Sequence, residues 1–283
     1  SAIFMAYNSW LADFCAPYPN RIKGMAMINV DSVEEGIAEL RRAAEIGLAG
    51  ATIPQRPFFG RYDSPMYEPL WIVAEELQMP LSIHSGTSRW YPNNVPSFGN
   101  SKGMVEFINQ EYDMRDNVVA MIFSGVFERH PRLKMGVVEY EISWAPYLLY
   151  RMDRTYMELP GLFKGTKRFA GDMIPSDFFK RNVFISFQED PVGIQMREYV
   201  GVQNLMWGSD YPHAESTFPR SQAILEEILP MMLELEWVST LSALTSPLTL
   251  ASNITLSFST KSPSIETSDK SIDVLFLAIC IYN

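Results

Sequence analysis

The sequence predicts an α/β protein of the (β/α)8 TIM-barrel type, in which parallel strands alternate with covering helices. Short apolar runs of strand length are separated by longer stretches in which apolar residues recur at helical spacing. The runs are apolar on both faces, which is typical of strands buried between layers. Polar side chains directly follow several of these runs, and barrel enzymes assemble their sites at those strand ends.

Six segments are predicted to be strands: 23–30, 49–54, 80–84, 134–139, 182–187 and 204–208. A closed barrel of this type needs about eight strands. Since residues 7–16 already have the sequence of a helix, we expect the missing first strand or strands to precede Ser1. A doubly wound sheet is the alternative architecture, but no glycine-rich phosphate loop supports it.

The helices are predicted between these strands. Residues 33–46 place apolar side chains on one face and end at Gly47, and residues 65–78 begin with a proline, which is tolerated at the first helical position. The longest helical stretch runs over 102–129 and is closed by Pro131. The remaining helices are expected over 144–157 and 221–235.

Composition narrows the class of function. The chain has 283 residues, of which 47% are hydrophobic, so it can build a large core. Its net charge of −10 argues against nucleic acid as a partner. The two cysteines, Cys15 and Cys280, form no CxxC pair, and no apolar run reaches the roughly 18 residues of a membrane span. We expect a soluble, cytoplasmic protein that acts on a small molecule and has no membrane partner.

Two of the three histidines lie where chemistry is expected. His84 ends one apolar run, and Asp210 follows another, with His213 three residues further on. Imidazole and carboxylate groups bind divalent metals, and a carboxylate beside a metal serves as an acid or base. The alternatives are structural: His84 as a hydrogen-bonded core residue, and Asp210 as a helix cap or loop residue.

A third acidic candidate follows the strand predicted at 134–139. Glu139 ends this run, and Glu141 lies two residues further on, so both side chains would point the same way from an extended strand. The sequence leaves these two glutamates as alternatives. Gln188 and Glu189 follow the next strand in the same manner.

Several motifs together resemble a known family. They are AYNSWLADFC at 6–15, PNRI at 19–22, ELRRAA at 39–44, His84, HPRLK at 130–134, Glu139 with Trp144, and GSDYPH at 208–213. The resemblance is to the amidohydrolase-related family, the branch of the amidohydrolase superfamily that includes aminocarboxymuconate-semialdehyde decarboxylase and the hydroxybenzoate decarboxylases. It covers residues 1–236, and it implies a distorted barrel with a divalent metal at the carboxyl ends of the strands.

By this resemblance His84 and Asp210 bind the metal, zinc most readily and manganese as the alternative. Asp210 also shuttles a proton, Glu139 is catalytic, and His213 orients Asp210 or contacts the substrate. Two departures from the family pattern stand out. The pair of metal ligands on the first strand has no counterpart in this chain, and Glu141 replaces the glycine of the turn after Glu139.

The resemblance implies a metal-dependent hydrolase or carboxy-lyase acting on a small carboxylated or aromatic substrate, in a chain that can form a homodimer. Arg89 and Trp90, in the loop after His84, are candidates for binding that substrate. The alternative is a catalytically inactive barrel fragment or a non-enzymatic interaction subunit. The barrel is expected to occupy residues 1–236, followed by an atypical segment rich in serine and threonine over 237–283.

Overall fold

The computed structural model describes residues 1–87, 101–159 and 168–233. Its centre is a six-stranded parallel sheet whose strands are hydrogen-bonded in the order in which they occur along the chain. The strands are β1 (Met25–Met27), β2 (Gly50–Ile53), β3 (Leu81–His84), β4 (Met135–Val138), β5 (Val183–Phe187) and β6 (Leu205–Trp207). Each lies within its predicted range, so the apolar runs located all six strands.

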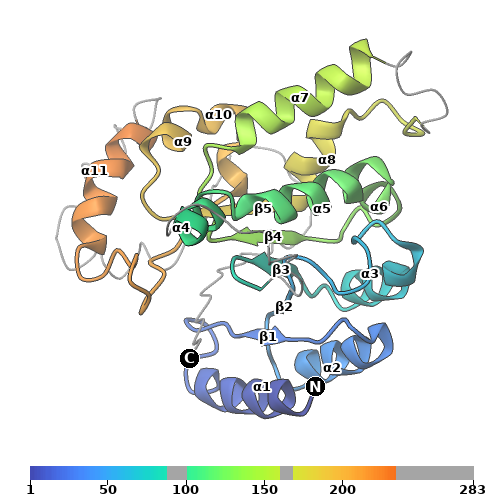
Figure 1. The fold of residues 1–283 in the computed structure, drawn as a ribbon. Coiled ribbons are helices and arrows are strands. Elements are labelled where there is room, and N and C mark those ends of the chain that lie inside the picture. The colour runs from blue at the N-terminus through green and yellow to red at the C-terminus, as the bar shows by residue number, and fades with distance from the viewer. Residues whose placement is uncertain (88–100, 160–167, 234–283) are drawn as a thin grey trace, which may run out of the picture.

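Helices connect and cover the strands. Their bounds are α1 (Ala2–Cys15), α2 (Val33–Glu45), α3 (Glu68–Glu76), α4 (Ser101–Ile108), α5 (Glu111–Phe123), α6 (Val126–Arg129), α7 (Ala145–Glu158), α8 (Pro175–Asn182), α9 (Pro191–Gln195), α10 (Arg197–Val200) and α11 (Ser221–Leu233), with short 3-10 turns at Pro65–Tyr67 and Val202–Asn204. Figure 1 shows the strands stacked through the middle of the molecule, with α1 and α2 at the β1 end and α7 and α8 at the β5 end.

Local chemistry explains where the helices begin and end. The Ser32 hydroxyl accepts a hydrogen bond from the backbone N–H of Glu35 and caps α2, while Gly47 just after this helix has a φ of +88°. Pro65 opens the turn that leads into α3, as its missing N–H permits. Gly47 and Pro65 mark these boundaries in the sequence, and both α2 and α3 were predicted.

The single helix predicted over 102–129 is wrong, because the structure divides this stretch into α4, α5 and α6. Gly125 interrupts it with a φ of +77°, a left-handed conformation that ends α5 and lets the chain change direction before α6. A turn at Asn109 and Gln110 separates α4 from α5. The helices α8, α9 and α10 were not predicted, since four to eight residues are too few to display a helical period.

The sheet has the order and strand direction of a parallel barrel, which confirms the predicted fold class. Within the described residues it contains six strands, with β1 and β6 at its two edges. No helix in this part of the chain is both long enough and apolar enough to cross a membrane. Consecutive parallel strands place all their carboxyl ends on one side of the sheet, and this alignment positions the site.

A cluster of ionisable side chains joins α3 to the end of α6 on the outside of the sheet. The side chain of His130 is 8% exposed, with its Nδ1 3.3 Å from Oε2 of Glu75 and its Nε2 3.1 Å from Oε1 of Glu68. Arg129 donates two further hydrogen bonds to the Glu68 carboxylate, which help to lower the pKa of that carboxyl to about 2. His130 therefore joins two carboxylates of α3 to the end of α6.

Replacing His130 with alanine should lower the free energy of unfolding by about 2 to 3 kcal/mol, because both carboxylates lose a buried partner. Urea titration followed by circular dichroism measures the change. Arg154→Ala, which removes an exposed ion pair with Glu158 within α7, is the matched control and should leave the midpoint unchanged. Equal effects of the two substitutions would contradict this role for the cluster.

Candidate active site

Three of the predicted site residues lie at the carboxyl ends of strands. His84 is the last residue of β3, Glu139 directly follows β4, and Asp210 lies three residues beyond the end of β6. Because β3 pairs with β4 and β5 lies between β4 and β6, these side chains converge at the carboxyl ends of the strands. The fold therefore brings together residues that are far apart in the sequence.

His84 and Glu139 are in direct contact. The Nε2 atom of His84 lies 3.0 Å from Oε1 of Glu139, and the hydroxyl of Ser85 donates a 2.7 Å hydrogen bond to the other carboxylate oxygen. The Nδ1 atom of His84 lies 2.9 Å from the carbonyl oxygen of Ser85. A carbonyl only accepts, so this contact places a proton on Nδ1 and directs Nε2 into the site.

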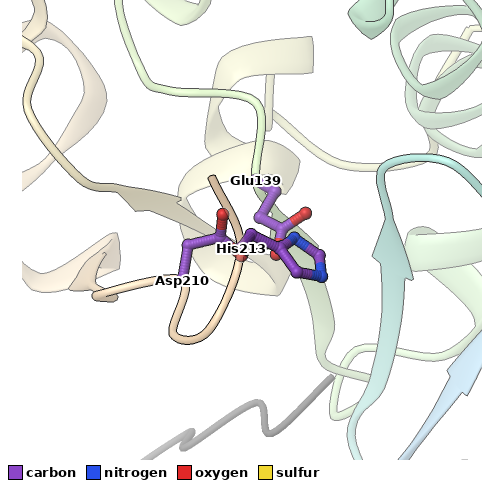
Figure 2. A group of neighbouring side chains, drawn as sticks. All are labelled: Glu139, Asp210 and His213. Carbon is purple, nitrogen blue, oxygen red and sulfur yellow. Dashed lines mark ion pairs between the residues drawn. The ribbon is translucent and has the colours of Figure 1, made fainter. Parts of the chain in front are cut away.

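Asp210 and His213 approach Glu139 from the loop after β6. Nδ1 of His213 is 3.1 Å from Oδ1 of Asp210. Ligand atoms of Glu139, Asp210 and His213 all lie within 4.8 Å of one another, and Figure 2 shows the three side chains gathered at one point. The Asp210 side chain is only 8% exposed, whereas that of His213 is 35% exposed, so the histidine connects the buried carboxyl to solvent.

The two carboxyl groups have opposite pKa shifts. Burial raises the pKa of Asp210 to about 8, and the hydrogen bond and negative charge of Glu139 add to this effect. Burial acts to raise the pKa of Glu139 as well, but hydrogen bonds from His84, Asp210 and Ser85 outweigh it and lower this pKa to about 2. Without a bound cation, the pair holds one proton near neutral pH, and that proton resides on Asp210.

The backbone is strained where these residues lie. Glu139, Glu141 and Asp210 have φ angles of +64°, +52° and +54°, in the left-handed region that favours glycine. Such conformations cost about 1 to 3 kcal/mol each and persist where surrounding contacts enforce them. Of the four non-glycine residues with positive φ in the described chain, these three border the site.

The structure separates the roles of the two glutamates that the sequence left as alternatives. Glu139 faces His84 and Asp210, whereas the carboxylate of Glu141 accepts hydrogen bonds from the backbone N–H groups of Gln188 and Glu189, at 3.1 and 3.4 Å. Burial raises the pKa of Glu141, in opposition to these two hydrogen bonds. The expectation that both side chains leave an extended strand in one direction is wrong, because both residues lie beyond the end of β4 in left-handed conformation.

A cavity of about 360 Å³ lies beside these side chains. It is large enough for one small ring compound with its substituents. Its lining consists of Ser85, Phe107, Gln110, Glu139, Glu141, Ser186, Phe187, Gln188, Glu189, Asp210 and Glu215.

Three polar residues of the site were not predicted. Ser85 holds the Glu139 carboxylate, the Ser186 hydroxyl accepts the backbone N–H of Glu139, and the Gln110 amide donates to the Glu139 carbonyl at 3.3 Å. Their positions just after or within strands, or at a break between helices, were the available signal. The predicted substrate-binding residues Arg89 and Trp90 lie outside the described residues and remain predictions.

The pKa of Asp210 leads to a pH-dependent prediction for the metal-free protein. A carboxyl whose folded pKa lies above its unfolded value contributes stability below the unfolded value, and this stability is lost as the pH rises toward about 8. Asp210→Asn mimics the protonated carboxyl and removes that loss. Its stability relative to the unmodified chain should therefore increase by up to about 4 kcal/mol between about pH 5 and about pH 8.

Thermal or urea unfolding in the presence of a chelator measures this difference. The exposed residue Asp172 supplies the control, because Asp172→Asn should follow the unmodified chain at every pH. A pH-independent difference for Asp210→Asn would contradict the raised pKa.

Comparison with known proteins places this geometry in a family. The Amidohydrolase family model matches residues 2–239. Gamma-resorcylate decarboxylase of Rhizobium sp. (strain MTP-10005) is 24% identical over 225 residues, which cover 72% of this chain and 64% of that protein. The chain thus spans less than two thirds of the length of this curated relative.

Solved structures show the same fold. The 5-carboxyvanillate decarboxylase of Sphingomonas paucimobilis superposes with a TM-score of 0.63 at 24% identity, covering 80% of this chain and 68% of that one. A dihydroxybenzoic acid decarboxylase of Polaromonas sp. JS666, solved with manganese and the inhibitor 2-nitroresorcinol, gives a TM-score of 0.61 at 20% identity, covering 79% and 68%. With a family model that matches most of its length, this chain belongs to the amidohydrolase family.

Proposed function

We propose that this chain is a metal-dependent carboxy-lyase that removes carbon dioxide from a small aromatic carboxylate. The observation that carries the proposal is the convergence of His84, Glu139, Asp210 and His213 beside a cavity of single-ring size. The names of the relatives support it, because gamma-resorcylate decarboxylase and 5-carboxyvanillate decarboxylase both act on such acids. Hydrolysis of a small substrate is the other reaction that the family admits.

The donor atoms fit a divalent cation. Glu139 and Asp210 are two carboxylates in hydrogen-bond contact, an arrangement that ordinarily repels unless a proton or a metal lies between them. The Nδ1 contact of His84 leaves Nε2 as the ligand atom, as is usual for metal-binding histidines. We assign Glu139, Asp210 and His84, whose Nε2 lies 3.0 Å from Glu139, as the residues that would hold the metal. His213 lies within 4.8 Å of both carboxylates and is the alternative third ligand.

Manganese suits this donor set better than zinc. Two carboxylates and one imidazole form an oxygen-rich site, which favours harder cations such as manganese. A related decarboxylase was solved with manganese, which points the same way, whereas the sequence alone favoured zinc. When bound, the cation would withdraw electron density from an oxygen of the substrate.

The chain's own residues then have separate tasks. Asp210 would pass a proton, supplied from solvent through His213, to the ring carbon when the bond from that carbon to the carboxylate breaks and the electron pair of that bond remains on the ring. Carbon dioxide leaves, and the proton lost by Asp210 is replaced through His213, whose Nδ1 lies 3.1 Å away and whose ring reaches solvent. Glu139 fixes the positions of both His84 and Asp210.

The test uses the full chain, dialysed, loaded with manganese and incubated with 2,6-dihydroxybenzoate. We expect release of carbon dioxide and resorcinol in equal amounts. His84→Ala should abolish both metal retention and turnover. His213→Ala should retain the metal and lower kcat by about 10²- to 10³-fold, because it removes only the return of the proton.

Metal content by elemental analysis and product analysis by chromatography separate the two variants. If His213→Ala loses the metal while His84→Ala keeps it, the assignment of ligands is reversed. A metal-loaded chain that cleaves esters or amides but releases no carbon dioxide would indicate the hydrolase instead. A chain that retains no metal would favour the inactive barrel, acting as an interaction subunit.

A further inference from the structure

We propose that the substrate of this site carries a hydrogen-bond donor or a cationic group, and no second carboxylate, on the side that faces Glu141. This inference rests on the proposed function and names the substrate class more narrowly. It follows from the charges of the cavity lining and from the fixed position of the Glu141 carboxylate.

The described lining of the cavity is strongly acidic. It includes five carboxyl groups, and none of its described members is a lysine, an arginine or a histidine. The five are Glu139, Glu141, Glu189, Asp210 and Glu215. A divalent cation held by Glu139 and Asp210 would offset the charge of those two alone, so Glu141, Glu189 and Glu215 remain to act on the substrate.

Glu141 cannot turn away from the cavity without losing its contacts. Each of its two carboxylate oxygens accepts one backbone N–H, from Gln188 at 3.1 Å and from Glu189 at 3.4 Å. Its own carbonyl oxygen accepts the indole N–H of Trp144 at 2.8 Å. A carboxylate oxygen accepts about two hydrogen bonds, so each still has an acceptor position available for a ligand.

Among the described residues, no lysine or arginine forms an ion pair that neutralises the Glu141 carboxylate. In the same part of the chain, the arginine that pairs with the cavity lining is Arg220, 3.9 Å from Glu189, and the Arg220 side chain is 69% exposed. A pair this long and this exposed to solvent screens little. Since like charges brought together in a half-buried cavity weaken binding, a second carboxylate on the substrate is disfavoured.

The aromatic walls and the small volume complete the argument. Phe107 and Phe187 line the same cavity, whose volume of about 360 Å³ lies at the lower end for ligand pockets. A single ring placed there, with its reacting carboxylate toward Asp210, would present its other substituents to the rest of the lining, which includes Glu141. A hydroxyl, amine or ammonium substituent on that side would donate to Glu141.

The experiment measures dissociation constants by isothermal titration calorimetry on the manganese-loaded chain. The probes are benzoate, 3-(aminomethyl)benzoate, isophthalate and benzylamine. We expect 3-(aminomethyl)benzoate to bind at least as tightly as benzoate, and isophthalate to bind at least about tenfold more weakly. This discrimination should shrink as salt is added, because it is electrostatic.

Two substitutions connect the preference to named groups. Glu141→Gln keeps one acceptor oxygen and removes the charge, and it should narrow the gap between isophthalate and 3-(aminomethyl)benzoate by about tenfold or more. Glu215→Gln changes an exposed residue that holds no backbone group, so it tests the same idea if the first variant folds poorly. Glu158→Gln, on the exposed end of α7, is the matched control and should change nothing.

Each outcome has a separate meaning. Isophthalate binding as tightly as 3-(aminomethyl)benzoate overturns this inference and leaves the proposed function intact. Binding of benzylamine without binding of any benzoate overturns the proposed function and preserves the preference for donors. Failure of all four probes overturns both.

Discussion

The contact between the carboxyl groups of Glu139 and Asp210 is the constraint on which the site depends. It joins the segment after β4 to the segment after β6, across the end of β5. Two acids in hydrogen-bond contact away from solvent must share a proton or a cation. The contact therefore determines both the charge of the site and the positions of its side chains. His84 and His213 each contact one member of the pair, and the exposed His213 links it to solvent.

The strained backbone shows how strongly this arrangement is enforced. Glu141 has a φ of +52°, a conformation that a glycine adopts at little cost. A glutamate there is tolerated because its carboxylate binds two backbone N–H groups beyond β5 that would otherwise need other partners. The Glu141 side chain thus holds the segment after β5 in place and adds a charge to the cavity.

Much of the fold could be predicted from the sequence, because burial on both faces leaves a clear mark on strands such as Met135–Val138. The residues His84, Glu139 and Asp210 could be located for the same reason, since each follows such a run. The break at Gly125 could not be foreseen, because a glycine within a helical pattern is compatible with a continuous helix as well as with its end. The direction in which the Glu141 side chain points could not be predicted from the sequence either. It depends on a left-handed backbone conformation that a glutamate rarely adopts.

The same reasoning explains why the acidic cavity and a metal centre belong together. Five carboxyl groups around one small cavity would repel one another and lower stability, unless protons, cations or backbone donors compensate each of them. Backbone N–H groups compensate Glu141, and a proton or a cation is needed between Glu139 and Asp210. Glu189 and Glu215 lie nearer the solvent, where water serves that purpose. A bound cation would therefore relieve the repulsion in the deepest part of the cavity, and a ligand that donates hydrogen bonds would relieve the part that the cation does not reach.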